Sequence, residues 1–236
     1  MQKRVLITGC GRSGTLYASI LLKKCSLDVP HERKMGKDGI SSWLFGASAV
    51  SAPWGPSPSE YRFEHTVQLL RDPLTCIPSI ATLRPAAWVY IAGYVPFEAS
   101  DSPLLKSAKY WYHWSMMIEP RADLRLRIED MPGALISLCD RLGAHVDLGA
   151  IERVPKDLNT RRYGSLLNFF ETRLIDLGLI CDRPFREMLF SRLTPAYGGT
   201  SWEALRALDP SLTEMIHAKA LEYGYEYGTR STGSLA

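Results

Sequence analysis

Short apolar runs alternate along this chain with longer segments whose apolar residues recur at helical spacing. Residues 4–8 form a β-branched apolar run that ends at glycines, which predicts a buried strand. The spacing in residues 16–24 predicts a helix directly after it. Further strands are predicted at residues 26–29, 66–70 and 124–129, the last because apolar and charged residues alternate there.

Start and stop signals place the remaining helices. Asp72 is a natural N-cap and Pro73 suits the first position of a helix, so a helix is expected from there to Ile80 or Leu83. Three prolines make residues 84–103 a predicted loop or broken segment. The other predicted helices are residues 40–50, 104–119, 131–142 (closed by Gly143), 165–176, 185–192, 201–208 and 210–223.

The order of these elements predicts an α/β fold. Repeated alternation of strand and helix is typical of a parallel sheet flanked by helices on both faces. The chain has 236 residues and no internal repeat, so a single domain over residues 1–236 is expected. Its hydrophobic content of 46% and charged content of 22% are ordinary for a protein with a substantial core.

Charge and cysteine content exclude several classes of protein. A net charge of +3 is too small to predict a nucleic-acid partner, although it is compatible with an anionic ligand. No apolar run approaches the ~18 residues of a membrane span, and the N-terminus lacks the apolar stretch of a signal peptide. The five cysteines include no CxxC pair, so neither a disulfide framework nor a zinc site is indicated, and a cytoplasmic location fits best.

The glycine-rich loop after the first predicted strand has a dinucleotide-binding interpretation. Gly9, Gly11 and Gly14 match GxGxxG between a strand and a helix. Asp28 and Glu32 follow at about the 20-residue distance at which a ribose-binding carboxylate is expected. A Rossmann-type NAD(P)-binding enzyme is therefore one alternative.

The same loop also suits a phosphate cradle. Gly9 and Gly14 are spaced as in GxxxxG, and backbone N–H groups there would point at an anion over the helix N-terminus. A nucleoside triphosphatase needs Lys after the last glycine, where this chain has Thr15. The positive charge stands inside the loop at Arg12, which disfavours ATP or GTP hydrolysis.

Three separated parts of the chain resemble the sulfotransferase family. The GRSGT stretch at residues 11–15 resembles its 5′-phosphosulfate loop, in which Ser-Gly-Thr follows a basic residue. The RDP stretch at residues 71–73, with Ser79 in the following helix, resembles its second element. Residues 201–205 and 220–225 are similar to the closing helices of bacterial members. The resemblance implies a P-loop sulfotransferase-like fold and the sulfuryl donor 3′-phosphoadenosine 5′-phosphosulfate (PAPS), which leaves as PAP.

The resemblance also implies roles in catalysis. Arg12 would stabilise charge on the bridging and leaving oxygens, as fixed positive groups do in phosphoryl transfer. Glu32, or alternatively His31, would take the proton of the acceptor, because the family uses either residue type as its base. No metal ion is expected.

The 3′-phosphate of the donor would have its own partners. Arg71 and Ser79 match the family positions that grip it, and a guanidinium with a hydroxyl at a helix N-terminus suits a dianion. The basic segment at residues 159–163 resembles one that closes over this phosphate, although a solvated loop remains its alternative. The donor-binding residues implied are Gly11, Arg12, Ser13, Gly14, Thr15, Leu16, Arg71, Ser79, Arg161 and Arg162.

The sequence does not identify the acceptor, which would be a hydroxyl or amine of a small molecule or carbohydrate. The aromatic run at residues 110–114 is predicted to pack in the core, because consecutive helical residues cannot all face one site. Cys10 is expected to pack rather than react. A non-catalytic nucleotide-binding protein of the same fold is the other alternative. Candidates for an acceptor pocket are Lys34, Lys37, Asp38 and Trp43.

Overall fold

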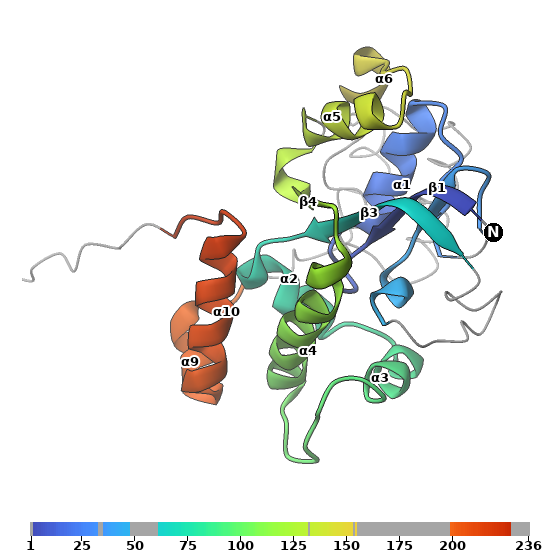
Figure 1. Ribbon diagram of the computed structural model, residues 1–236. Helices are drawn as coiled ribbons and strands as arrows, with labels where there is room; N and C mark the ends of the chain where they lie inside the picture. The colour runs from blue at the N-terminus through green and yellow to red at the C-terminus, as the bar shows by residue number, and fades with distance from the viewer. Residues whose placement is uncertain are drawn as a thin grey trace, which may run out of the picture.

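The computed structural model describes residues 2–32, 35–47, 61–131, 133–152, 154 and 199–227. Within these ranges four parallel strands form one sheet in the order β2-β1-β3-β4. The predicted α/β class with a parallel sheet is confirmed (Figure 1). The strands are β1 (Gln2–Thr8), β2 (Gly39–Ser41), β3 (Arg62–Leu70) and β4 (Leu124–Arg127).

Helices follow most strands, as the alternating pattern predicts. The α-helices of the described ranges are α1 (Thr15–Lys24), α2 (Pro73–Ile80), α3 (Pro85–Ile91), α4 (Pro103–Ile118), α5 (Gly133–Arg141), α6 (Leu148–Glu152), α9 (Trp202–Leu208) and α10 (Pro210–Glu222). Short 3-10 helices are η1 (Trp43–Gly46), η3 (Glu119–Arg121) and η4 (Ile128–Asp130).

Helices lie on both faces of the sheet because strand side chains alternate in direction. Leu69 and Leu70 of β3 enter different hydrophobic clusters. The cluster of Leu69 includes residues of α1, α5 and α6, and the cluster of Leu70 includes residues of α2, α4, α9 and α10. Figure 1 shows α1, α5 and α6 on one side of the sheet and α2 and α4 on the other.

Several predicted elements are confirmed because local signals define their ends. Asp72 caps α2 by accepting from the Leu74 backbone N–H at 3.2 Å, and Pro73 is its first residue. Gly143 follows α5 with a φ of 55°, the left-handed conformation expected of a glycine after a helix. α1, α4, α9 and α10 also lie where helical spacing predicts them.

The prediction of a strand at residues 26–29 is wrong, and β2 lies further along the chain. Ser26 has a φ of 60°, which turns the chain sharply after α1. Gly39 instead pairs with Val5, and a Cβ at Gly39 would lie 1.8 Å from the Val5 carbonyl oxygen. The close approach of the two strands therefore requires glycine at this position.

One further prediction fails and another holds only in part. The helix predicted at residues 40–50 is replaced by the end of β2 and by η1, which Ser42 caps with its hydroxyl. Residues 84–103 contain α3, because Pro85 occupies a first helical position, where a missing N–H costs nothing. The helices predicted at residues 165–176 and 185–192 lie outside the described residues.

Three tyrosines attach the C-terminal segment to the sheet. The hydroxyls of Tyr223, Tyr225 and Tyr227 each donate to a carboxylate, at distances of 2.8, 3.0 and 2.8 Å. The accepting residues are Glu119, Glu129 and Asp72 respectively. The segment after α10 is thereby tied to Asp72, directly after β3, and to Glu129, just after β4.

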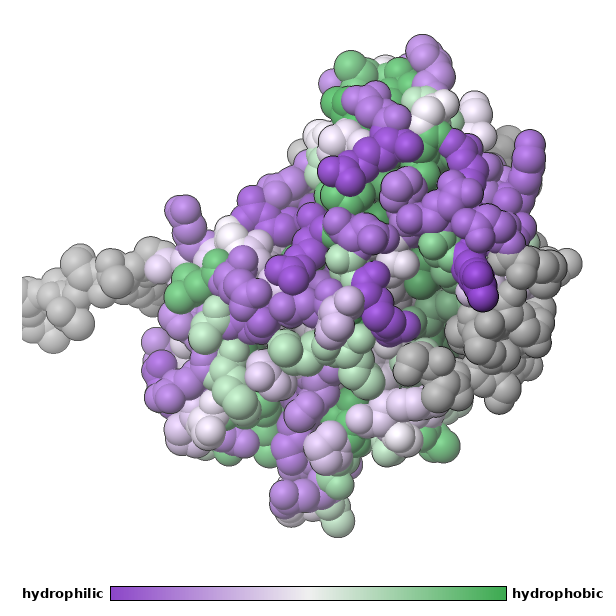
Figure 2. All heavy atoms as spheres, in the orientation of Figure 1, coloured by the Kyte–Doolittle hydropathy of each residue, from purple (hydrophilic) through white to green (hydrophobic). Residues whose placement is uncertain are grey.

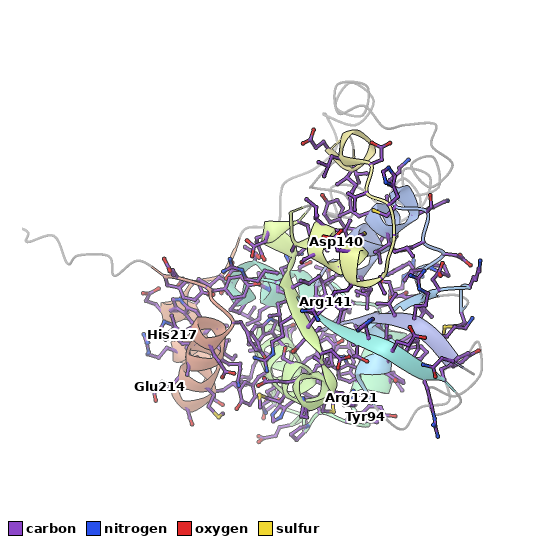
Figure 3. The ribbon with its side chains drawn as sticks, turned by 45° about the horizontal axis from the view of Figure 1, so that its top comes forward. Tyr94, Arg121, Asp140, Arg141, Glu214 and His217 are labelled. Atoms are coloured by element: carbon purple, nitrogen blue, oxygen red, sulfur yellow. The ribbon has the colours of Figure 1, made fainter. Side chains whose placement is uncertain are left out.

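Charged groups cover the outer sides of the helices. Asp140 and Arg141 on α5 and Glu214 on α10 are exposed, and Figure 3 shows them on separate parts of the molecule. Apolar surface is visible over α5 and α6 in Figure 2, where Ile136 and Leu148 are 37% and 50% exposed. Within the described ranges, no helix is both long enough and apolar enough to cross a bilayer.

Candidate functional site: a glycine loop and its cavity

The loop between β1 and α1 has the backbone of a tight turn into a helix. Arg12 has a φ of 77° and Gly14 a φ of 98°, both in the left-handed region. Gly9 is packed so closely that a Cβ there would lie 2.3 Å from the Leu69 carbonyl oxygen. Ser13 closes the loop by donating its N–H to the Cys10 carbonyl at 3.0 Å.

The start of α1 presents N–H groups that no described residue accepts. Gly14 is the N-cap and supplies no side-chain cap, and no described acceptor contacts the N–H of Thr15 or Leu16. Such groups together with the helix dipole attract an anion. The Ser13 N–H is engaged within the loop and its side chain is buried, so the expected contribution of Ser13 to anion binding is not supported by this geometry.

A cavity of about 480 Å³ opens beside the loop. Its lining comes from four segments: the loop with the start of α1, the turn before β2, η1, and the chain from the end of α2 into α3. The described residues that line it are Gly11, Arg12, Gly14, Thr15, Leu16, His31, Glu32, Trp43, Leu44, Leu83, Arg84, Ala86, Ala87 and Tyr90.

His31 and Glu32 meet Thr15 in this cavity. His31 Nε2 lies 3.1 Å from the Thr15 hydroxyl and 3.5 Å from Glu32 Oε1. His31 forms an isolated parallel bridge with Ser41, and Glu32 has a φ of 57° and donates its N–H to the Ser41 carbonyl at 3.1 Å. Ser41 also donates its hydroxyl to the Thr15 carbonyl at 2.7 Å. Ser41 thus joins the turn that carries both candidate bases to the start of α1.

Arg12 lines the cavity from the loop and reaches the end of α2. Its Nη2 donates to the Thr82 hydroxyl at 3.2 Å, and that hydroxyl donates to the Ser79 carbonyl at 2.8 Å. Arg71 donates from Nη1 to the Arg12 carbonyl at 3.1 Å. The structure therefore places Arg71 against the loop, whereas Ser79 is linked to the loop through its backbone carbonyl and Thr82. Neither residue lines the described cavity.

Some predicted pocket residues have structural roles instead. Asp38 accepts from Arg4 at 3.1 Å and from the Asp28 N–H at 2.9 Å, and it does not line the cavity. Lys37 is exposed and also lies outside it, whereas Trp43 lines it as expected. Lys34, Arg161 and Arg162 lie outside the described residues.

Cys10 packs in the core, in agreement with the expectation for it. Its sulfur lies 3.6 Å from that of Cys76, and both residues are buried. The hydrogen bond with Cys76 and burial raise the pKa of Cys10 well above its ordinary value. Cys10 therefore remains a neutral thiol at neutral pH and offers no nucleophile to the cavity.

Sequence reasoning missed two contributions to the site. The Tyr110 hydroxyl accepts the Gly11 N–H at 2.7 Å, a contact that no sequence spacing indicates. The helix α3, which lines one side of the cavity, could have been predicted from the sequence, because Pro85 followed by two alanines is a helix start signal. Tyr110, Trp111 and Trp114 are buried, as predicted for the aromatic run.

No group of three or more His, Cys, Asp or Glu side chains in the described ranges could hold a metal ion. Comparison with known proteins adds no family assignment: no protein-family model matches the chain, and no curated protein matches it in sequence. The interpretation of the site therefore depends on its own geometry and chemistry.

Proposed function

We propose that this chain is a sulfotransferase of P-loop type, which transfers a sulfuryl group from PAPS to a hydroxyl or amine of an acceptor. One observation carries the proposal: residues at the start of α1, whose N–H groups no described residue accepts, line the same cavity as Arg12, His31 and Glu32. Sulfuryl transfer needs an anion cradle and a proton acceptor within one space.

The residues beside the loop fit an anionic donor with two charged ends. The N–H groups of Thr15 and Leu16, the Thr15 hydroxyl and the Arg12 guanidinium would hold the phosphosulfate end. In our proposal Arg71, which contacts the loop through the Arg12 carbonyl, holds the 3′-phosphate together with Ser79. When bound, PAPS supplies the sulfuryl group and a leaving phosphate.

The proton of the acceptor would pass to Glu32. Glu32 lines the cavity, and its Oε1 lies 3.5 Å from His31 Nε2. His31 is the alternative base, but its Nε2 already lies between the Thr15 hydroxyl and Glu32. In our proposal Glu32 therefore accepts the proton and His31 orients Glu32 against the loop.

Strand order disfavours the dinucleotide-binding alternative. A Rossmann sheet has the order 3-2-1-4, in which the first strand lies between the second and the fourth. Here β1 lies between β2 and β3, the order of the flavodoxin-like class. Asp28, one of the two candidate ribose carboxylates, accepts from the Lys37 N–H and does not line the cavity.

Binding of PAP tests the first half of the proposal. A ligand at ~100 times its dissociation constant should stabilise the protein by about 2.7 kcal/mol, which thermal denaturation detects. Arg12→Met should weaken PAP binding ~10-fold or more, because a charged hydrogen bond is lost. The matched control Arg141→Met changes an exposed arginine of α5 outside the cavity and should bind normally. Stabilisation by NADH and not by PAP would transfer the assignment to a dinucleotide enzyme.

Transfer of radiolabelled sulfate from PAPS across a panel of acceptors tests the second half. Loss of a general base typically costs ~10²–10⁴-fold in rate, so Glu32→Gln should fall by that amount while retaining PAP affinity. Glu64→Gln alters an exposed glutamate on β3 outside the cavity and should leave the rate unchanged. Normal PAP binding without turnover on any acceptor would instead support the non-catalytic nucleotide-binding alternative.

A further inference from the structure

The cavity has an apolar wall that the transfer chemistry does not use. Trp43 and Leu44 come from η1, and Ala86, Ala87 and Tyr90 come from α3. The rings of Trp43 and Tyr90 pack edge to face with centroids 5.6 Å apart. The Tyr90 hydroxyl donates to the Leu44 carbonyl at 3.2 Å, so this polar atom is already engaged by the protein.

The aromatic part of the wall continues into the core. Trp43 also packs on Trp114 and Tyr110, with ring centroids 5.9 and 6.3 Å away, and both of these residues are fully buried. Aromatic contacts of this kind hold ring orientations. Trp43 therefore presents an apolar surface that is backed by the core.

Three polar side chains of the cavity lie together, while Arg84 lies at the start of α3 beside the apolar residues. His31 Nε2 lies 3.1 Å from the Thr15 hydroxyl and 3.5 Å from Glu32 Oε1. The loop adjoins the apolar side, since a Cβ at Gly11 would lie 3.5 Å from a methyl group of Leu83. A molecule in the cavity can thus present one reactive group to Glu32 while its body lies on the apolar wall.

We infer that the acceptor is an apolar, ring-bearing compound with a single reactive hydroxyl, about the size of two or three fused rings. This inference rests on the proposed function. A cavity of about 480 Å³ is within the range of small-molecule sites, ~300–1,000 Å³. In the reaction the acceptor oxygen forms a bond to sulfur, the bond from sulfur to the leaving phosphate oxygen breaks, and the hydroxyl proton goes to the Glu32 carboxylate.

Other acceptor classes fit this wall less well. A sugar has hydroxyls around its ring, and those turned to Leu44, Ala86 and Ala87 would lose their hydrogen bonds to water without replacement. An amine is protonated at neutral pH and must lose a further proton before its nitrogen can attack sulfur, a cost that a hydroxyl does not carry. A hydroxyl on an apolar ring system avoids both costs.

Calorimetric titration of the PAP complex tests the inference without turnover. The probes are 2-naphthol, the saturated alcohol decahydro-2-naphthol and the disaccharide cellobiose. Both ring alcohols should bind at least ~10-fold more tightly than cellobiose, because only they match the apolar wall. Equal or tighter binding of cellobiose, or no binding of either ring alcohol up to its solubility limit, overturns the inference.

Variants of α3 locate the binding surface. Ala87→Phe and Ala86→Phe each fill the cavity from the wall, and Ala86 is exposed enough to accept a ring without overpacking the core. Either variant should weaken 2-naphthol binding ~10-fold or more and leave PAP affinity unchanged. Val89→Phe is the matched control, because Val89 is 78% exposed on the same helix and does not line the cavity.

The two proposals fail in different ways. If the wild-type protein does not bind PAP, the sulfotransferase proposal is contradicted. If PAP binds normally but Ala86→Phe and Ala87→Phe both leave the affinity for 2-naphthol unchanged, the acceptor class alone is contradicted. Retained PAP affinity also shows that each variant is folded.

Discussion

The Gly11 backbone N–H donates a hydrogen bond of 2.7 Å to the Tyr110 hydroxyl. Gly11 belongs to the loop after β1 and Tyr110 to α4, and both residues are buried. The contact fixes the first half of the loop to the helix layer on one face of the sheet. The N–H groups left for a ligand are accordingly those further along, at the start of α1.

Tyr110→Phe should destabilise the protein by about 1–3 kcal/mol, because the buried Gly11 N–H then has no acceptor. Urea denaturation measures this change. Tyr112→Phe is the matched control on the same helix: its hydroxyl makes no hydrogen bond with the described residues, so its effect should be within about 0.5 kcal/mol. Equal effects of the two substitutions would contradict the importance of the Gly11 contact.

Gly9→Ala should destabilise the protein by about 1–3 kcal/mol, because the new methyl group would lie 2.3 Å from the carbonyl oxygen of Leu69. Leu69 belongs to β3, which is paired on both sides and cannot move away easily. Gly133→Ala is the comparison, since a Cβ there meets nothing within 4 Å. Gly133→Ala should leave the midpoint of thermal denaturation unchanged or raise it slightly, because alanine favours a helix. A Gly9→Ala protein as stable as the wild type would show that the loop can relax.

Asp72→Ala should destabilise the protein by about 1–2 kcal/mol through loss of the α2 cap. The same substitution removes the acceptor of the Tyr227 hydroxyl, so amide hydrogen exchange should quicken in the segment after α10 as well as at the start of α2. Asp140→Ala changes an exposed aspartate on α5 and should alter neither the free energy of unfolding nor these exchange rates. Unchanged exchange after α10 would show that Tyr227 does not hold the segment.

Stability should fall at alkaline pH in part through Cys139. Burial and the neighbouring Cys25 thiol raise the pKa of Cys139 to about 12, whereas an unfolded cysteine titrates near ~8.5. A raised folded-state pKa stabilises the protein fully below pH ~8.5, and this contribution is lost as pH rises towards 12. Urea titrations at pH 7.5, 9 and 10 measure the free energy of unfolding. Between these pH values it should fall in the wild type by up to about 1.4 kcal/mol per pH unit more than it falls in Cys139→Ala. Parallel pH profiles would exclude this role for the thiol.

Local sequence signals predicted most of the helices and three of the four strands. Asp72 and Pro73 define the start of α2 through a side-chain cap and a fixed φ, both of which act within a few residues. The strand β2 could not be predicted in the same way. It has three residues, and its position depends on pairing with Val5, more than thirty positions earlier.

The candidate site was predicted in part. The loop, Arg12, His31 and Glu32 were chosen from residue types and a family resemblance, and all line one cavity. His31 and Glu32 were expected at the end of a strand over residues 26–29, but they reach the cavity through the bridge of His31 with Ser41. The structure brings these residues to one cavity, but the strand expected to carry them is absent from the described residues 26–29.

The sequence by itself determined the unit of strand, glycine loop and helix, because β-branched runs, glycine and helical periodicity act over a few neighbouring residues. Tertiary structure alone decided which loop N–H groups are engaged and which remain for an anion, since Tyr110 reaches Gly11 across 99 positions. It also decided that α3 and η1 form the apolar wall of the cavity. Side-chain contacts between distant segments depend on how the layers pack, and no local pattern specifies that packing.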